Sequence, residues 1–313
     1  MTAAGRQRLT TPLVASGEPA GTAPTPVLDL SRCRLDFEHR VAVMGIVNRT
    51  PDSFYDRGAT FEFAAAVDLA RRLVADGADI VDVGGVKGGP GQTVTVADEI
   101  ERVVPLIEAL RAAEPDVLIS VDTYRSPVAD AALSAGADIV NDVTGLHDIE
   151  VLDVVAAHDA GYVAMHHGGQ PRTRPFRRSY VPDVTTVVIE HCRWLTDRAM
   201  AAGVRRERLI VDPGHDFQKT TYHSLELSRW LPELAALGFP VLVALSNKDF
   251  VGEVLGAPLA KRVDGSLAAA VFSILRGASI VRAHEVGRTV DAVRMTEALL
   301  GWRPPAAAVR GLE

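Results

Sequence analysis

The stretch Val41-Ala-Val-Met-Gly-Ile-Val47 is a short apolar run that ends at a polar residue, Asn48. Seven more such runs follow, and a helical pattern comes after each. They are Asp79–Val83, Val117–Val121, Ala137–Val140, Tyr162–Met165, Arg208–Val211, Pro240–Leu245 and Ser279–Val281. Eight alternating strands and helices predict an α/β fold, the closed parallel (β/α)8 TIM barrel, which typically takes ~250 residues. The 313 residues of the chain accommodate one such barrel.

The remaining segments are short. Residues 1–26 are rich in Thr, Ala, Pro and Gly, which predicts a flexible N-terminal tail. Residues 27–305 are expected to form the single barrel domain, and residues 306–313 a C-terminal tail. Val27–Leu30 and Arg34–Phe37 predict a hairpin that closes the bottom of the barrel. Helices are expected at Phe61–Asp76, Val96–Ala113, Pro127–Ala135, Ile149–Ala160, Asp183–Ala202, Leu225–Ala236, Ser266–Arg276 and Val290–Leu300.

Bulk composition argues against several classes of partner. The net charge of −7 opposes binding to a nucleic-acid backbone, and the basic run Arg172–Arg178 falls where a barrel has an active-site loop or a solvated segment. The sequence contains no stretch of ~20 apolar residues, so a membrane span is not expected. With only Cys33 and Cys192 there is no disulfide framework, so a reducing cytoplasm is the expected location. Cys192 lies in an apolar helical pattern and is expected in the core.

Asp122, Asn141, Asp212 and Lys248 lie at or just beyond strand ends. In a parallel barrel these ends converge on one mouth, where ligands bind. Carboxylate, amide and ammonium groups together suit a heterocycle that carries both hydrogen-bond donors and acceptors. The alternative is that these residues only close strands and open turns, as Asp212 could in Asp-Pro-Gly.

A second polar group follows the last strand. Arg282 and His284 occupy the region after strands seven and eight, a frequent phosphate site in barrels, and Arg binds phosphate in bidentate fashion. Asn48 could add one oxygen to a Mg²⁺ that substrate phosphates mainly hold. His284 could instead be a structural histidine. His166, His167 and His215 lack the spacing of a zinc motif, so a protein-built zinc site is not expected.

With these residues identified, the chain resembles dihydropteroate synthases over about residues 40–303. The matching segments are Met44–Phe54, Asp82–Gly85, Ser120–Tyr124, Gly136–Asp142, Met165–His166, Asp212–Gly214, Ser246–Lys248, Asp264–Ala269 and Gly277–His284. That family condenses a dihydropterin methyl pyrophosphate with p-aminobenzoate to give dihydropteroate, a folate precursor. The resemblance also implies a Mg²⁺ cofactor, a homodimer, and small-molecule ligands as the partners, with no nucleic acid or membrane.

The resemblance assigns roles to individual residues. Asp122, Asn141, Asp212 and Lys248 match residues that hold the pterin, and Asn48, Arg282 and His284 match those around Mg²⁺ and pyrophosphate. Phe217 and Ser246 fall where p-aminobenzoate is contacted. Asp122, Lys248 and Arg282 are the expected catalytic residues. In the family, pyrophosphate departs first and the arylamine attacks the resulting cation, so Arg, His and Mg²⁺ would stabilise the departing charge.

The chain departs from the family mainly in its loops. The family's Gly-Gly-Glu-Ser-Thr-Arg-Pro-Gly is here Gly84–Gly91, with Gly88 and Gly89 at the Thr and Arg positions. Asn247 replaces the Arg of Ser-Arg-Lys. The remaining departures are Asp216 and Gln218 in place of glycines, His167 in place of Met or Asn, and Arg49, Tyr55 and Arg57 in the first loop.

Three hypotheses follow. In the first, condensation is impaired or lost while the pterin and pyrophosphate pocket is retained, as in the divergent second copy of the enzyme that some actinobacteria carry, which the chain resembles. In the second, Lys87, Arg49 or Arg57 replaces the missing charge and the synthase is fully active. In the third, the barrel binds another ligand or is regulatory, and His167, His215 and Asp216 are new contacts.

Overall fold

The computed structural model describes residues 26–50, 62–173 and 179–310, and within them the predicted barrel is confirmed. The eight barrel strands are β3 (Ala42–Asn48), β4 (Ile80–Gly84), β5 (Leu118–Asp122), β6 (Ile139–Asp142), β7 (Gly161–Met165), β8 (Leu209–Asp212), β9 (Leu242–Ala244) and β10 (Ile280–Ala283). Each of the eight apolar runs supplies one of them. Residues 1–25 of the expected N-terminal tail lie outside the described part, as do 51–61 and 311–313.

The strands form one parallel sheet that closes on itself. Neighbouring strands pair in the order β8-β7-β6-β5-β4-β3-β10-β9, and β10 pairs with β3 in the register Ile280 with Ala42. A parallel bridge between Val211 and Val241 joins the two ends of the sheet, β8 and β9. All eight C-terminal strand ends therefore meet at one mouth, the geometry on which a shared site depends.

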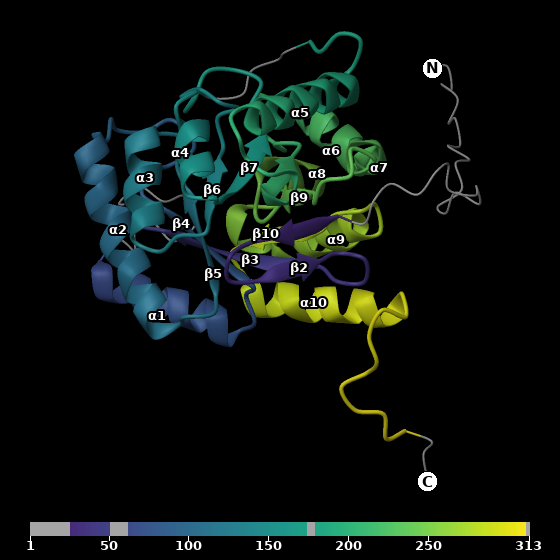
Figure 1. Ribbon diagram of the computed structural model, residues 1–313. Coiled ribbons are helices and arrows are strands. Elements are labelled where there is room, and N and C mark those ends of the chain that lie inside the picture. Colours follow the sequence, from purple (N-terminus) through teal and green to yellow (C-terminus); the bar gives the residue numbers. More distant parts are fainter. Residues whose placement is uncertain (1–25, 51–61, 174–178, 311–313) are drawn as a thin grey trace.

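Helices surround the strands (Figure 1). They are α1 (Phe63–Ala75), α2 (Val96–Ala113), α3 (Ser126–Ser134), α4 (Val151–Ala157), α5 (Val184–Ala201), α6 (Thr221–Arg229), α7 (Leu231–Ala235), α8 (Asp249–Leu255), α9 (Val263–Ile274) and α10 (Val286–Leu299), with 3-10 turns at Arg206–Arg208 and Leu259–Lys261. None of the described helices is long and apolar enough to cross a bilayer.

One helix prediction is wrong in its extent. Leu225–Ala236 was expected to be continuous, but the chain forms α6 and α7 with a break at Trp230. Pro232 explains the break, because a proline ring clashes with the carbonyl four residues earlier and has no N–H to donate. Helix α6 also starts earlier than expected, because the Thr220 side chain accepts a hydrogen bond from the backbone N–H of His223 at 3.3 Å. Helix α8 was not predicted.

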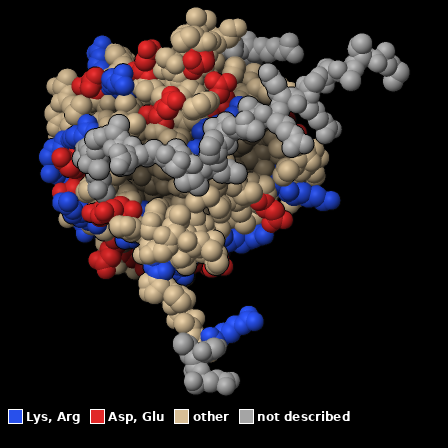
Figure 2. Space-filling view, turned by 90° about the vertical axis from the view of Figure 1, so that its right-hand side faces the viewer, with Lys and Arg blue, Asp and Glu red and all other residues tan. Residues whose placement is uncertain are grey.

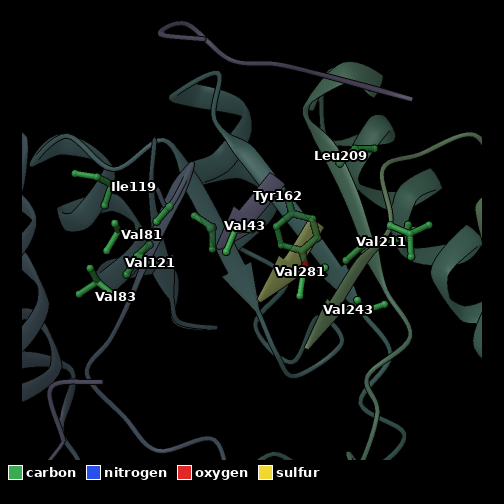
Figure 3. Close-up of a cluster of buried hydrophobic side chains, with 14 of the residues drawn as sticks. Val43, Val81, Val83, Ile119, Val121, Tyr162, Leu209, Val211, Val243 and Val281 are labelled. Carbon is green, nitrogen blue, oxygen red and sulfur yellow. The ribbon is translucent and has the colours of Figure 1, made fainter. Parts of the chain in front are cut away.

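Alternate residues of each strand face opposite sides of the barrel wall. The outward set packs under the helices and includes Val43, Val81, Ile119, Tyr162 and Val281 (Figure 3). The inward set near the bottom is apolar and forms a separate cluster, which contains Ala42, Met44, Ile80, Leu118, Ile139, Val163, Ile210, Leu242 and Ile280. The same alternation makes the inward positions nearer the mouth Asp82, Ser120, Asn141 and Arg282.

The predicted hairpin closes the bottom of the barrel. Strands β1 (Val27–Asp29) and β2 (Arg34–Asp36) pair antiparallel, and the hairpin lies in front of the barrel strands in Figure 1. Leu28 and Leu35 are 0% and 2% exposed and belong to the same apolar cluster as the lower interior of the barrel. Burial of these side chains therefore fixes the hairpin to the strands.

Replacing Leu35 by Ala tests this arrangement. Because Leu35 is 2% exposed, the variant loses buried apolar surface and leaves a cavity, so we expect the free energy of unfolding to fall by ~2–5 kcal/mol. Urea unfolding followed by circular dichroism measures the change. Arg34→Ala is the matched control, since the neighbouring Arg34 side chain is 64% exposed. An equal, small effect of both substitutions would show that the hairpin does not close the core.

Candidate functional site

The polar residues at the mouth come from separate strands. Asp122 ends β5, Asn141 lies in β6, Asp212 ends β8, and Arg282 lies in β10. Asn141 and Asp212 are buried, at 2% and 4% exposure. Buried polar groups need partners, so their contacts indicate how the site is built.

An arginine and two carboxylates form the centre of the site. Nε of Arg282 donates to Oδ2 of Asp82 at 2.7 Å, and its Nη2 donates to Oδ2 of Asp122 at 3.0 Å. Asn141 Nδ2 also donates to Oδ2 of Asp82, at 3.2 Å. Four side chains from β4, β5, β6 and β10 are thereby joined across the barrel, and the predicted contribution of Asp122, Asn141 and Arg282 to one site agrees with this geometry.

Burial and neighbouring charge change the ionisation of this cluster. Burial, with the adjacent Asp82 carboxylate as a second cause, raises the pKa of Asp122 to about 8, and Arg282 acts in the opposite direction. The Asp122 side chain nevertheless keeps 15% exposure. A carboxyl group that holds a proton at neutral pH can donate as well as accept a hydrogen bond.

Lys248 and Asp212 form the other wall of the mouth. Lys248 precedes α8, and its Nζ donates to the carbonyl of His215 at 2.5 Å and lies 4.9 Å from the centre of the Phe217 ring. Oδ1 of Asp212 accepts from the Gly214 N–H at 2.7 Å. Burial raises the pKa of Asp212, while Lys248 acts against that rise. The predicted p-aminobenzoate contact Phe217 therefore lies beside the predicted pterin-binding lysine.

The corner after β10 contains His284 and Ser246. Ser246 Oγ lies 3.0 Å from Nδ1 of His284 and accepts from its backbone N–H at 3.2 Å. The resemblance assigned Ser246, together with Phe217, to p-aminobenzoate. Its hydrogen bonds are instead with His284, a residue expected to bind pyrophosphate. Asn48 ends β3, and its Oδ1 lies 3.1 Å from where a Cβ of Gly84 would be.

Few of the described side chains at the mouth could ligate a metal. Among the described residues, no group of three or more His, Cys, Asp and Glu side chains could hold an ion. Asn48 offers one amide oxygen, which fits a Mg²⁺ that keeps waters and binds mainly through substrate phosphates. His167 is 2% exposed and burial lowers its pKa to about 4. His215 is 0% exposed, and its Nε2 lies 3.0 Å from Ser228 Oγ.

Two important residues were missed by sequence reasoning. Asp82 is fully buried within the apolar strand Ile80–Gly84, and a lone carboxylate in such a strand is a signal that it has a charged partner. Lys219 is 2% exposed and its Nζ donates to the carbonyls of His166, Gly214 and Phe217 at 2.9–3.0 Å. Burial lowers the pKa of Lys219 to about 7. Because its partners are mostly backbone atoms, no pattern of side chains in the sequence indicates them.

The glycine loop between β4 and α2 is not forced to contain glycine. Neither Gly88 nor Gly89 has a φ between +20° and +160°, and a Cβ at Gly88 would lie 3.7 Å from the Phe217 ring, an ordinary contact. Arg172, from the loop after β7, donates to the carbonyl of Gln92 in this loop at 2.7 Å. Arg172, the first residue of the predicted basic run, thus joins two loops, whereas 174–178 lie outside the described residues.

The loop between β8 and α6 keeps a glycine-like backbone without glycine. Asp216 and Gln218 have φ of 67° and 53°, in the left-handed region that costs a side chain ~1–3 kcal/mol. Gln218 Nε2 donates to Thr173 Oγ1, and the Gln218 carbonyl accepts from Tyr180 OH at 3.0 Å. Asn247 also has a positive φ of 58°, and its side chain is 1% exposed with neither polar atom hydrogen-bonded. Asn247 is therefore buried in the described structure, without a hydrogen bond that would explain its side chain.

The chain is similar to proteins of one family along most of its length. The family model described as pterin binding enzyme matches residues 44–284. A protein of Mycobacterium tuberculosis named inactive dihydropteroate synthase 2 is 53% identical over 277 residues, covering 87% of each chain. A dihydropteroate synthase of Synechocystis is 41% identical, covering 89% of this chain and 96% of its own.

A solved structure extends the agreement to the whole fold. The dihydropteroate synthase of Xanthomonas albilineans with 4-aminobenzoic acid has a TM-score of 0.80 and 40% identity, covering 90% of this chain and 100% of that one. The matched region includes all eight barrel strands from Met44 onward and the residues through His284. The barrel, the polar mouth and these matches together establish that the chain belongs to the dihydropteroate synthase family of pterin-binding enzymes.

Proposed function

We propose that this protein binds a dihydropterin pyrophosphate at the barrel mouth and condenses it with p-aminobenzoate weakly or not at all. The observation that carries the proposal is a contrast between two parts of the site. The pterin-side cluster of Asp82, Asp122, Asn141 and Arg282 is complete and hydrogen-bonded. The loop that faces Phe217 carries Gly88 and Gly89, where the family has Thr and Arg.

The pterin side offers what the chemistry needs. Asp122, Asn141, Asp212 and Lys248 supply both acceptors and donors for a fused heterocycle, and the catalytic assignment of Asp122, Lys248 and Arg282 is part of this proposal. Arg282 and His284 would bind the departing pyrophosphate. Asn48 would hold one position of a Mg²⁺, which neutralises phosphate charge when bound. Nearby carboxylates tolerate the cationic character that the pterin acquires as the pyrophosphate leaves.

The arylamine side supports a loss of activity. Two glycines provide no hydroxyl and no guanidinium, and they increase the entropy that the loop loses on closing over a substrate. The backbone at both positions would accept a side chain. The proposed loss of activity therefore comes from the missing side-chain groups of the loop and not from a change of fold. The relative named inactive dihydropteroate synthase 2 in Mycobacterium tuberculosis points the same way.

A fully active synthase is the second candidate. It would need a replacement for the missing charge. Arg49 donates to the carbonyls of Glu101 and Arg102 in α2 at 3.1 and 2.9 Å, which fits a structural role better, and Arg57 lies outside the described residues. Lys87 lines the cleft beside Gly88, His167 and Arg172, so it is the better replacement. The cytoplasmic location expected from the sequence belongs to both candidates as a prediction.

A paired assay of the purified protein with Mg²⁺ tests the proposal. Calorimetry measures binding of the dihydropterin pyrophosphate, and pyrophosphate release is timed with and without p-aminobenzoate. We expect binding with little or no p-aminobenzoate-dependent release. Rapid, p-aminobenzoate-dependent release would establish the active synthase instead, and no binding would contradict the retained pterin pocket.

Restoring the loop chemistry should restore turnover. The double variant Gly88→Thr/Gly89→Arg returns a hydroxyl and a charge, and one charged contact is worth ~1.5–3 kcal/mol, so we expect condensation to rise by roughly tenfold or more. Initial rates of dihydropteroate formation measure it. Gly88→Thr/Gly89→Gln is the matched control, with side chains of similar reach but no charge. If both variants remain as slow as the parent protein, the glycines do not explain the defect.

Pterin binding should depend on pH through Asp122. Its raised pKa of about 8 means that the ligand-free protein holds a proton there below that pH. A ligand that needs the ionised carboxylate must displace this proton, so its affinity should rise by up to about tenfold per pH unit toward pH 8 and level off above it. Calorimetry from pH 6 to 9 measures the trend. Asp122→Asn should flatten it, and an unchanged slope in that variant would exclude Asp122 as the source.

We further propose that the protein forms a homodimer through α9 and α10. These helices pack beside each other and carry exposed apolar side chains: Leu275 at 56%, Met295 at 59% and Leu299 at 75% exposure. In Figure 2, an area without charged side chains adjoins the C-terminal tail that follows α10. An apolar surface of this kind favours association.

Sedimentation analysis tests the dimer. We expect a mass twice that of the 33.4-kDa chain, and a monomer for the double variant Met295→Glu/Leu299→Glu, because buried carboxylates would oppose association. Ile149→Glu is the matched control, since Ile149 is 55% exposed and lies outside both helices. A dimer that survives in the double variant would place the interface elsewhere.

A further inference from the structure

The carboxylate of Asp216 is held at one place on the Phe217 side of the mouth. Its Oδ2 accepts from the backbone N–H of Phe250 at 3.3 Å, and its Oδ1 accepts from Ser224 Oγ at 3.3 Å. The Asp216 N–H donates to the same Ser224 oxygen at 3.1 Å. Two contacts, one from each of two helices, thus hold the carboxyl group where, by the family's pattern, a glycine would place none. Burial raises the pKa of Asp216, and the neighbouring Lys248 acts against that rise and favours the ionised form.

This charge acts on Lys248. Asp216 and then Asp212 raise the pKa of Lys248, against the lowering caused by its burial. The Lys248 ammonium lies 4.9 Å from the centre of the Phe217 ring. The Lys248 cation beside the Phe217 ring therefore feels two protein carboxylates, Asp216 and Asp212, which offset part of the positive charge that could attract a ligand anion.

We propose that Asp216 makes the second-substrate pocket select an uncharged aromatic amine over an aromatic carboxylate. This inference rests on the proposed function, since it takes Phe217 as the second-substrate contact. p-Aminobenzoate carries a full negative charge at neutral pH. An additional unit charge near a partly buried site weakens the binding of an anion by about tenfold or more and leaves that of a neutral ligand nearly unchanged.

A purely structural role for Asp216 makes a different prediction. Its hydrogen bonds to Phe250 and Ser224 help to hold the start of α8 against α6. Asparagine keeps one of the two acceptor oxygens, has nearly the same shape and tolerates the left-handed backbone at φ 67°. It removes the charge, and its amide group faces Ser224 Oγ, which can accept as well as donate. Asp216→Asn therefore separates the effect of charge on ligand choice from the effect of packing on the loop.

The test compares two ligands that differ only in charge. Calorimetry follows 4-aminobenzoate and 4-aminobenzamide binding to the full-length protein saturated with 6-hydroxymethyl-dihydropterin. We expect the parent protein to bind the amide about tenfold more tightly than the acid. Asp216→Asn should strengthen binding of the acid by about tenfold and leave the amide unchanged. Asp249→Asn is the matched control, because Asp249 also adjoins Lys248 but is 82% exposed and paired with Arg262.

Any other outcome contradicts either the inference about Asp216 or the proposed function on which it rests. An equal change for both ligands in Asp216→Asn would assign Asp216 to packing alone. If the parent protein binds the acid more tightly than the amide, the inference is wrong, whether or not Asp216→Asn folds. If Asp216→Asn does not fold, Asp216→Gly takes its place as the variant without the charge. Binding of the pterin without either arylamine would refute the role of Asp216 but leave the pterin site. Failure to bind the pterin would refute the proposed function.

Discussion

Arg282 is the cation that lets two carboxylates share the barrel interior. Asp82 has no exposed surface and Asp122 keeps little, and two buried carboxyl groups so close together oppose each other's ionisation unless a positive partner is present. The guanidinium contacts both, and Asn141 shares the same Asp82 oxygen. The polar upper layer of the barrel thus depends on one residue from the last strand. Its removal would leave uncompensated charge as well as a lost ligand contact.

The sequence predicts the eight strands and most of the site, because apolar runs mark buried parallel strands and the polar residues after them mark the mouth. It does not predict which residues within a run face inward, since strands buried on both faces have nearly continuous apolar sequences. Asp82 was missed for that reason. Arg282 and Asp122 are 160 residues apart, so their contact exists only once the barrel closes. Lys219 was missed because its partners are mainly carbonyls, and the break between α6 and α7 because the helical period continues through Trp230.

The departures from the family form a pattern in space. The β4–α2 loop has lost side chains at Gly88 and Gly89, whereas the β8–α6 loop has gained them at Asp216 and Gln218. The gained side chains keep the left-handed backbone and add contacts: Gln218 reaches Thr173, and Asp216 reaches the start of α8. Arg172 joins the loop after β7 to the β4–α2 loop. Compared with the family, the mouth therefore has fewer side chains on the β4–α2 loop that could contact a ligand. It has more contacts that join its other loops and helices to one another.

The hairpin at the bottom of the barrel has a consequence for handling the molecule. Strand β1 begins at Val27 beneath the barrel, and Glu297 near the end of α10 accepts a hydrogen bond from the Val41 N–H at 2.9 Å, just before β3 starts. Both described ends of the chain therefore leave from the face opposite the mouth. A tether or sensor surface joined to the chain at Val27, where β1 begins, would attach on the face away from ligand entry, so protein immobilised there can serve directly for capture of small molecules.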